Sequence, residues 1–206
     1  MTEGDVRDIL REQFNVSRET MTQLERLVDL VIAESAHQNL ISASTIPHFW
    51  ERHILDSAQL LALAPSEGVW IDLGSGAGFP GIVIAIMRAQ PMILVEERRK
   101  RFVFLHDLVE ALNLKNVTVH GGRLETMPAT RAAVISARAF APLDKLLTLA
   151  HRFSYPETLW ILPKGKSAQE ELEAAQESWQ GVFYVKQSIT DSDAAIIVAS
   201  QVRPRV

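Results

Sequence analysis

Two stretches near the start of the chain carry apolar residues on one face of a helix. These apolar residues are Leu24, Leu27, Val28, Val31 and Ile32 in the first stretch, and Phe49, Ile54, Ala58 and Leu61 in the second. Ser17 precedes the first stretch, where its hydroxyl can cap a helix. Pro65 and Gly68 end the second stretch. Residues 1–65 are therefore predicted to form a helical extension packed on the rest of the protein.

From Val69 onward, short apolar runs alternate with segments of helical period. The runs that predict strands are 69–73, 91–97, 116–122, 132–140, 158–165, 181–189 and 194–202, and the predicted helices are 80–88, 99–114, 142–153 and 167–179. Strands alternating with helices favour a parallel sheet covered on both faces. The last two strands are separated only by a short polar turn, which predicts one antiparallel strand. Residues 66–206 are thus expected to form one α/β domain.

Composition narrows the class of protein. Of 206 residues, 47% are hydrophobic and 22% charged, which is typical of a globular chain. The chain has no cysteine, so neither a disulfide framework nor a thiolate metal site is available, and no metal is expected. The first residues lack the apolar core of a secretory signal, and no apolar run is long enough to cross a bilayer. A cytoplasmic protein without a membrane partner is expected.

Four glycines follow the first predicted strand in the segment WIDLGSGAGFPG. Asp72, Gly74, Gly76 and Gly78 form an acidic-x-G-x-G-x-G pattern, while Gly76, Gly78 and Gly81 match G-x-G-x-x-G. Ligands of doubly wound sheets bind at the carboxyl ends of the strands. Glycine there permits positive φ and a close approach of backbone to ligand. The loop therefore predicts a site for a nucleotide-like molecule.

Two ligand classes compete for this loop. A dinucleotide fingerprint beginning at Gly76 starts two residues late, and one beginning at Gly74 meets Phe79 where Gly or Ala is needed. The acidic pattern fits S-adenosylmethionine without a shift, with Asp72 near its cationic end, either directly or by shaping the loop. Glu96 ends the second strand, where it can accept hydrogen bonds from the ribose hydroxyls of either ligand. The residues favour S-adenosylmethionine over NAD, and Phe79 is expected to pack on the donor.

Five stretches resemble one protein family in order and spacing. They are NLISA (39–43), RHILDS (52–57), DLGSGAGFPGI (72–82), ARAFAPL (137–143) and LPKGK (162–166). Over essentially its whole length, the chain resembles the bacterial RsmG (GidB) family of 16S rRNA guanine-N7 methyltransferases. The resemblance implies a class I methyltransferase fold, Rossmann-like with a seven-stranded, mostly parallel sheet. It also implies S-adenosylmethionine as donor, S-adenosylhomocysteine as product, and N7 of guanine 527 in the 530 loop as acceptor.

The resemblance carries further expectations to particular positions. It implies donor contacts at Gly74, Phe79, Leu124, Glu125 and Arg138, with Glu96 at the family's acidic position. It implies 16S rRNA as partner, within the small ribosomal subunit or an assembly intermediate, and a monomeric enzyme. The chain departs from the family at Ile41, where Thr is common, and at Glu97, where a small residue is common, so the local hydrogen bonds at both positions can differ.

The reaction explains why no general base is assigned. Guanine N7 carries a lone pair and no proton at neutral pH, so its attack on a sulfonium methyl releases no proton from N7. Holding the two reactants in line can supply about 7–11 kcal/mol of the barrier in favourable cases. The target base is expected to turn out of the RNA into a pocket.

Cations recur on the segments that follow the predicted strands. They are Arg98, Arg99, Lys100, Arg101, Arg123, Arg138, Lys164 and Lys166. Carboxyl ends of parallel strands share one edge, so these cations predict a phosphate-binding face on a chain whose net charge is −4. Asn39, Arg52 and His53 are further candidates for contact with RNA. The alternative for His53 is a polar cluster, with Asp56 and Ser57, that pins the N-terminal helices to the sheet.

Two other functions stay open on the sequence. An NAD(P)-dependent oxidoreductase would also carry a glycine-rich loop after its first strand. A non-catalytic RNA-binding module could keep a methyltransferase fold and lose the donor site. Cofactor binding separates these functions from the methyltransferase.

Overall fold

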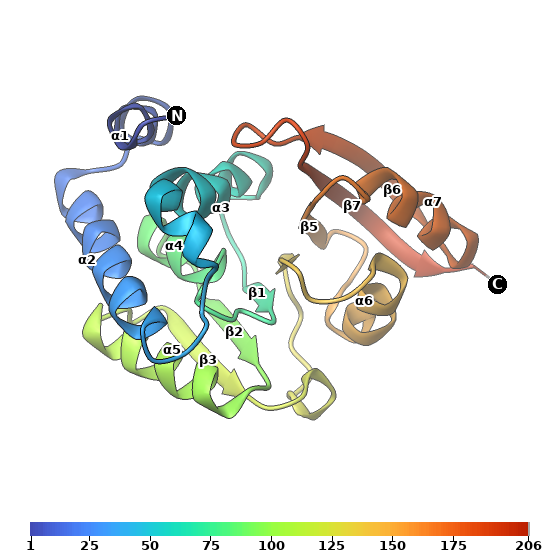
Figure 1. The fold of residues 1–206 in the computed structure, drawn as a ribbon. Helices are drawn as coiled ribbons and strands as arrows, with labels where there is room; N and C mark the ends of the chain where they lie inside the picture. Colours follow the sequence, from blue (N-terminus) through green and yellow to red (C-terminus); the bar gives the residue numbers. More distant parts are fainter. Residues whose placement is uncertain (206) are drawn as a thin grey trace.

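The computed structural model describes residues 1–205 (Figure 1). Its N-terminal part consists of α1 (Glu3–Phe14), α2 (Arg18–Ser35), η1 (Ala43–His48), η2 (Trp50–Leu55), α3 (Asp56–Ala58) and η3 (Gln59–Leu63). The strands are β1 (Trp70–Leu73), β2 (Met92–Glu96), β3 (Val117–Gly121), β4 (Val134–Ala137), β5 (Leu159–Lys164), β6 (Trp179–Gln187) and β7 (Ala195–Pro204). The remaining helices are α4 (Gly81–Met87), α5 (Arg99–Ala111), η4 (Leu124–Thr126), α6 (Leu143–Ala150), η5 (His151–Phe153) and α7 (Ala168–Ser178).

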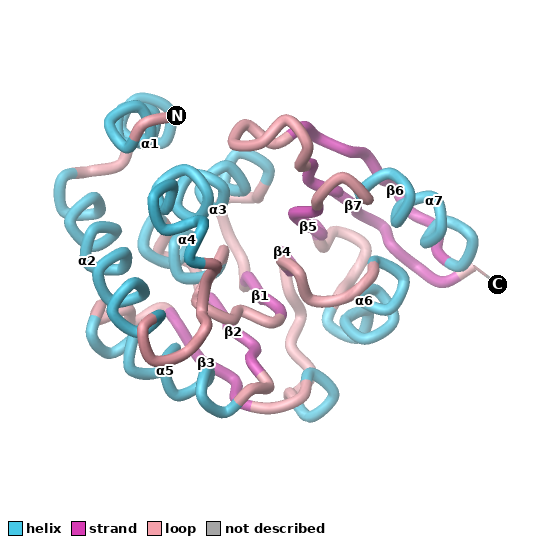
Figure 2. Tube along the Cα trace, in the orientation of Figure 1, coloured by secondary structure: helices cyan, strands magenta, loops and turns pink. Residues whose placement is uncertain are grey.

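The seven strands form one sheet in the order β3-β2-β1-β4-β5-β7-β6. The first five strands of this order run parallel, and β7 is antiparallel to both β5 and β6. The predicted α/β class and the antiparallel strand are confirmed. The order reverses between β1 and β4, and such a switch point opens a crevice at the carboxyl ends of the strands. Figure 2 shows the loop after β4 running from this region to α6.

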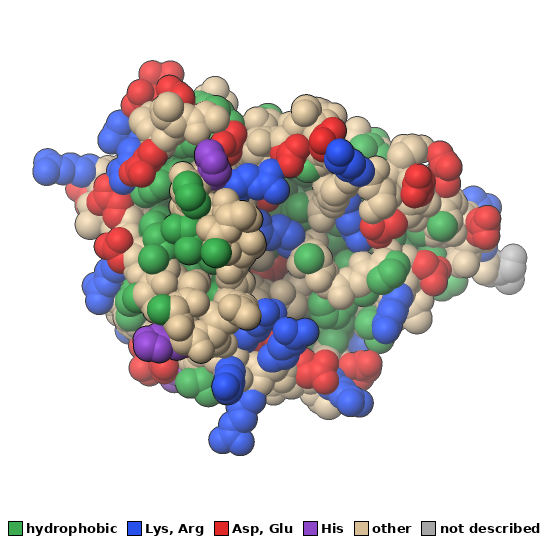
Figure 3. Space-filling view, in the orientation of Figure 1, with side chains coloured by type: hydrophobic (Ala, Val, Ile, Leu, Met, Phe, Trp, Pro, Cys, Tyr) green, Lys and Arg blue, Asp and Glu red, His purple; other side chains and the backbone are tan. Residues whose placement is uncertain are grey.

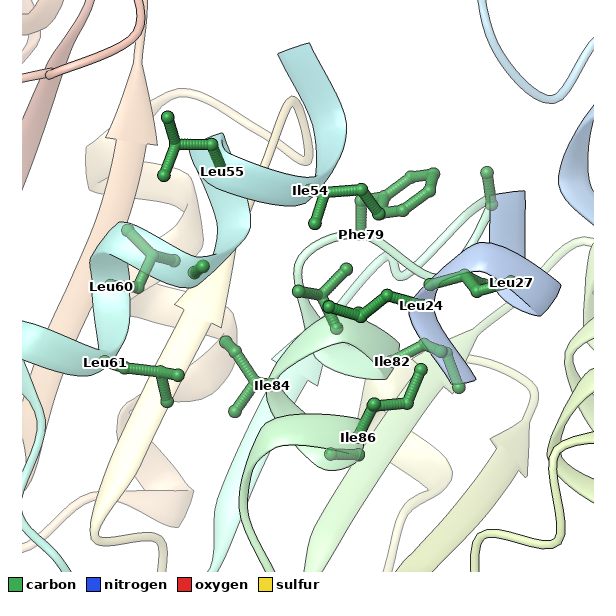
Figure 4. Close-up of a cluster of buried hydrophobic side chains, with 14 of the residues drawn as sticks. Leu24, Leu27, Ile54, Leu55, Leu60, Leu61, Phe79, Ile82, Ile84 and Ile86 are labelled. Carbon is green, nitrogen blue, oxygen red and sulfur yellow. The ribbon is translucent and has the colours of Figure 1, made fainter. Parts of the chain in front are cut away.

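Each face of the sheet has its own core because successive side chains of a strand point to opposite faces. In β1, Trp70 packs in the core beneath α2, α4 and α5, whereas Ile71 and Leu73 pack beneath α6 and α7. Figure 4 shows Leu24 of α2 beside Ile82 of α4 in the first core. The N-terminal helices therefore share a core with the main domain, as an extension packed on it would.

The N-terminal helices begin as predicted, but the second does not continue as predicted. Ser17 caps α2, since its hydroxyl oxygen accepts from the Thr20 N–H at 3.1 Å. The single helix predicted through residues 49–64 is instead a π-helical turn, three α-helical residues and a 3₁₀ turn. The Ser57 hydroxyl donates to the His53 carbonyl at 2.6 Å, a type of bond that bends helices. No helix within residues 1–205 is long and apolar enough to cross a membrane.

Candidate active site at the carboxyl edge of the sheet

The glycine loop has a backbone that only glycine adopts easily. Gly74, Gly76 and Gly78 have φ values of +66°, +58° and +97°. A Cβ on Gly74 would lie 2.6 Å from the Phe140 ring. Gly81 differs, because a Cβ there would meet Leu94 of β2 at 2.3 Å. Gly81 thus serves the packing of α4 on the sheet.

Asp72 lies beneath this loop and is fully buried. Its carboxylate accepts from the Ser136 hydroxyl at 2.7 Å and from the Gly81 N–H at 3.3 Å. Burial raises the pKa of Asp72 to about 6, although both hydrogen bonds oppose the shift. Of the two predicted roles of Asp72, the geometry supports the shaping of the loop.

Glu96 ties the end of β2 to the glycine loop. One carboxylate oxygen accepts from the Gly76 N–H at 2.9 Å and the other from the Arg98 N–H at 2.7 Å. Each oxygen has a second lone pair, so the carboxylate can still accept from a ligand hydroxyl. Glu96 is largely buried but lines a cavity, as its predicted role requires.

A cavity of about 450 Å³, here called the glycine-loop cavity, opens beside this carboxylate. Its lining comprises Gly74, Val95, Glu96, Glu97, Arg98, Arg101, Gly122, Arg123, Leu124, Glu125, Ala139, Phe140, Ala141, Lys145 and Leu149. The structure thus brings together four predicted donor residues, Gly74, Glu96, Leu124 and Glu125. The volume is within the range of small-molecule sites.

A second cavity, of about 630 Å³, lies on the other side of the loop that follows β4. We call it the ion-pair cavity, and its charged lining consists of Arg52, Asp56, Arg138, Lys164, Lys166, Glu171, Asp191 and Asp193. Ala139, Phe140 and Ala141 line both cavities and form a shared wall. Figure 3 shows Lys and Arg side chains around the hollow at the centre of this face.

Every cation of the ion-pair cavity is matched by a carboxylate. The pairs are Arg138–Asp56 at 3.4 Å, Lys164–Glu171 at 2.7 Å, Lys166–Asp193 at 2.9 Å and Arg52–Asp191 at 2.5 Å. In contrast, Arg98, Arg99 and Lys100 have no ion-pair partner within residues 1–205. The predicted RNA cations therefore fall into two electrostatic groups.

Lys164 binds other groups of the protein itself. Its side chain is only 10% exposed, and its ammonium donates to the Ala141 carbonyl at 3.0 Å and to Glu171. Glu171 also accepts from the Leu143 N–H at 3.0 Å. Lys164 and Glu171 thus hold the end of the shared wall, and RNA contact by Lys164 stays a prediction. No pattern in the sequence predicts that Lys164 of β5 contacts Glu171 of α7.

The polar cluster predicted around His53 is present and includes Arg138. An Arg138 guanidinium nitrogen lies 3.3 Å from His53 Nδ1, and His53 Nε2 lies 3.0 Å from the Thr45 hydroxyl. Burial, reinforced by the positive charges of Arg138 and Arg52, lowers the pKa of His53 to about 3. His53 is therefore neutral near pH 7, and its contacts support the pinning role. Arg138 lines the ion-pair cavity and not the glycine-loop cavity.

Phe79 is buried behind the glycine loop, 3% exposed. Its ring stacks on His53 with a centroid distance of 4.9 Å and meets Phe49 edge-on at 5.7 Å. Phe79 lines neither cavity, so its contact with the donor stays a prediction. The aromatic side chain that lies against Gly74 is instead Phe140, which the sequence offered only as part of ARAFAPL.

The remaining RNA candidates lie around the glycine-loop cavity. Arg101 lines this cavity and donates to the Asn39 carbonyl at 3.3 Å, while Arg123 pairs with Glu97 at 3.2 Å on the surface. Arg99 and Lys100 are exposed in the first turn of α5. For each of these residues, contact with RNA stays a prediction.

Comparisons with solved structures identify the fold. A SAM-dependent methyltransferase from Aquifex aeolicus superposes with a TM-score of 0.60 at 16% identity, covering 75% of this chain and 93% of that chain. TYW2 from M. jannaschii, in complex with AdoMet, gives a TM-score of 0.59 at 12% identity, covering 82% and 80%. The predicted class I methyltransferase fold is confirmed.

Sequence relatives identify the family. The family model for rRNA small subunit methyltransferase G, GidB, matches residues 20–197. "Ribosomal RNA small subunit methyltransferase G" from Rhizorhabdus wittichii is 56% identical, covering 100% of this chain and 95% of the relative. The protein of the same name from Sphingopyxis alaskensis is 52% identical, covering 96% and 86%. The oxidoreductase alternative is therefore wrong, and the chain belongs to the GidB family, rRNA small subunit methyltransferase G.

Proposed function

We propose that this protein transfers a methyl group from S-adenosylmethionine to N7 of the target guanine in the 530 loop of 16S rRNA, acting as a monomer. The observation that carries the proposal is the pair of cavities at one sheet edge, separated by a wall only three residues long. One cavity suits the donor and the other the base. Neighbouring sites with a common wall are what a direct transfer between two bound molecules requires.

The groups that line the glycine-loop cavity suit S-adenosylmethionine. Glu96 presents a fixed carboxylate with spare lone pairs to ribose hydroxyls, and Gly74 offers backbone without a side chain. Leu124 adds a buried apolar side chain. When bound, the donor supplies a methyl group on a positively charged sulfur. Glu96, Gly74 and Leu124 are the residues that would hold the donor in this cavity.

The ion-pair cavity fits a base turned out of the RNA. Phe140, Pro142 and Pro163 give it apolar surface, and the ion pairs give it polar groups. Aromatic and apolar side chains commonly hold flipped bases by stacking. Guanine N7 needs no base to accept a methyl group, so these residues have only to place N7 at the wall.

Transfer of labelled methyl tests the proposal. Small subunits and free 16S rRNA lacking the modification are incubated with the folded protein and labelled S-adenosylmethionine. Label is expected at N7 of the target guanine, and the better of the two substrates identifies the assembly state that the enzyme uses. Binding of S-adenosylhomocysteine without any transfer to either RNA would contradict the proposal and favour the non-catalytic module.

A further inference from the structure

We infer that Asp56 is the residue that selects guanine, by accepting a hydrogen bond from the 2-amino group on the base's Watson–Crick edge in the ion-pair cavity. The inference rests on the proposed function, because it assumes that the flipped base enters this cavity. Asp56 belongs to α3 in the N-terminal extension, and its side chain is 19% exposed. The extension would then contribute the specificity of a site whose donor half lies in the main domain.

The two oxygens of Asp56 have different surroundings. Oδ1 accepts from the Gln59 amide at 2.9 Å and from the Thr190 hydroxyl at 2.8 Å. Oδ2 has a single contact within residues 1–205, with Arg138 at 3.4 Å. A carboxylate oxygen has two acceptor positions, and 3.4 Å is long for a charge-assisted bond. The carboxylate is therefore fixed through one oxygen while the other keeps accepting capacity.

The other three carboxylates of the cavity are less suited to this role. Glu171 is occupied at both oxygens, by Ser167 on one side and by Lys164 and the Leu143 N–H on the other. Asp191 keeps one acceptor position on each oxygen, but it is 29% exposed and its carboxylate forms a close ion pair with Arg52 at 2.5 Å. Asp193 has a free oxygen but is 61% exposed, so water competes for it. Asp56 is the least exposed of the four carboxylates, and its Oδ2 has only one long contact, with Arg138.

The chemistry of the base makes a carboxylate selective. Guanine carries two neighbouring donors on its Watson–Crick edge, N1–H and the 2-amino group, whereas adenine has an acceptor at N1. A carboxylate accepts only, so it matches guanine and repels the adenine edge. N7 lies on a different edge of guanine, so a base with N7 at the shared wall turns its Watson–Crick edge toward the other side chains of the cavity.

Hypoxanthine at the target position tests this directly, because it keeps N7 and N1–H and lacks the 2-amino group. We compare kcat/KM on ligated 16S rRNA carrying guanine or hypoxanthine at the target. The unmodified enzyme should prefer guanine by about 10-fold or more, the usual effect of one hydrogen bond to a charged acceptor. In Asp56→Asn an amide replaces the free oxygen, and the preference should fall to about 1.

Two further variants separate base reading from structure. Asp193→Asn alters an exposed carboxylate of the same cavity and should keep the full preference for guanine. Thr190→Val removes one hydrogen bond that orients Asp56 and should reduce the preference partly, which keeps the inference testable even where Asp56→Asn fails to fold. Thermal unfolding and S-adenosylhomocysteine affinity of each variant show which proteins are folded.

The outcomes distinguish this inference from the proposed function. Methylation by the unmodified enzyme with an unchanged preference for guanine in Asp56→Asn overturns the inference and leaves the proposed function standing. Equal rates on guanine and hypoxanthine in the unmodified enzyme also overturn it. No methylation of either RNA by the folded unmodified enzyme overturns the proposed function, and the inference with it.

Discussion

The two cavities lie on either side of one short wall, yet they differ in how many of their cations are paired with a carboxylate. Around the ion-pair cavity each cation faces a carboxylate partner. At the start of α5, beside the glycine-loop cavity, Arg98, Arg99 and Lys100 have no such partner within the described residues. Unpaired cations are available to phosphates, whereas paired cations hold the protein's own segments in place. Cations that look equivalent in the sequence therefore have different electrostatic surroundings.

The largest effect is expected from a side chain introduced at Gly74, which lines the glycine-loop cavity. Gly74→Val forces a β-branched residue to a φ of +66° and brings its Cβ against the Phe140 ring. Affinity for S-adenosylhomocysteine should fall by at least about 100-fold, roughly the factor that 2.8 kcal/mol gives, measured by calorimetry on folded protein. Gly165→Ala in the ion-pair cavity is the matched control, because a Cβ there has open space. Unchanged affinity in Gly74→Val would count against the donor site.

Neutralising the unpaired cations should weaken RNA binding next most strongly. Replacing Arg98, Arg99 and Lys100 by Gln removes three cations that are free to meet RNA phosphates. The slope of log affinity against log salt should flatten by about 0.7 for each phosphate that the variant no longer neutralises, and affinity at low salt should fall roughly 10-fold or more. Filter binding across a salt series measures both.

The matched control for that variant neutralises paired cations. Arg52→Gln with Lys166→Gln removes two cations that face Asp191 and Asp193. The salt slope should change by less than the amount expected for a single phosphate. An equal change in the two variants would show that pairing does not decide which cations meet RNA.

The protein should become less stable when Glu171, which holds the end of the shared wall, is changed. Although burial opposes ionisation, Lys164, Ser167 and the Leu143 N–H together hold the pKa of Glu171 below its ordinary value. Glu171→Gln removes that charge and should lower the free energy of unfolding by about 1–2 kcal/mol, measured in urea near pH 7. Glu173→Gln, exposed on the same helix, should stay within about 0.5 kcal/mol of the unmodified protein. A similar decrease in both variants would show that Glu171 does not anchor the wall.

One buried titratable group beside each cavity should make the stability of the fold depend on pH. Asp72, with its raised pKa, binds its proton more tightly when folded, so it stabilises the fold at low pH and this contribution is lost as the pH rises from about 4 to 6. His53, with its lowered pKa, contributes stability above its ordinary pKa of 6.5 that is lost as the pH falls toward about 3. Between about pH 4 and 6, Asp72 makes the free energy of unfolding fall with rising pH, whereas His53 makes it rise.

Asp72→Asn should remove the contribution of Asp72 and leave that of His53. Relative to the unmodified protein, the free energy of unfolding of the variant should rise with pH by up to about 1.4 kcal/mol per unit between about pH 4 and 6. Urea unfolding at several pH values in that range measures the difference. A difference between the two proteins that does not vary with pH would mean that Asp72 is not protonated in the folded state in this range.

The sequence by itself determined the strands, the helices after residue 69, the class of fold and the glycine loop after β1. Apolar runs of strand and helix period mark each strand and the helices after residue 69, because burial of one face imposes that period on the residues. Gly74, Gly76 and Gly78 predict the loop, because the positive φ values that it requires favour glycine. Glu96 was predicted at the site because the carboxyl ends of parallel strands share one edge.

Only the tertiary structure decided which charged and aromatic side chains face the cavities. Lys164 meets Glu171, Arg138 meets Asp56, and Phe79 turns into the core while Phe140 covers Gly74. Each of these contacts joins different elements of the fold. Period and motif describe neighbours along the chain, and they do not indicate which distant carboxylate neutralises a given cation. That pairing follows from the packing of whole helices on the sheet, so it is decided only when the fold forms.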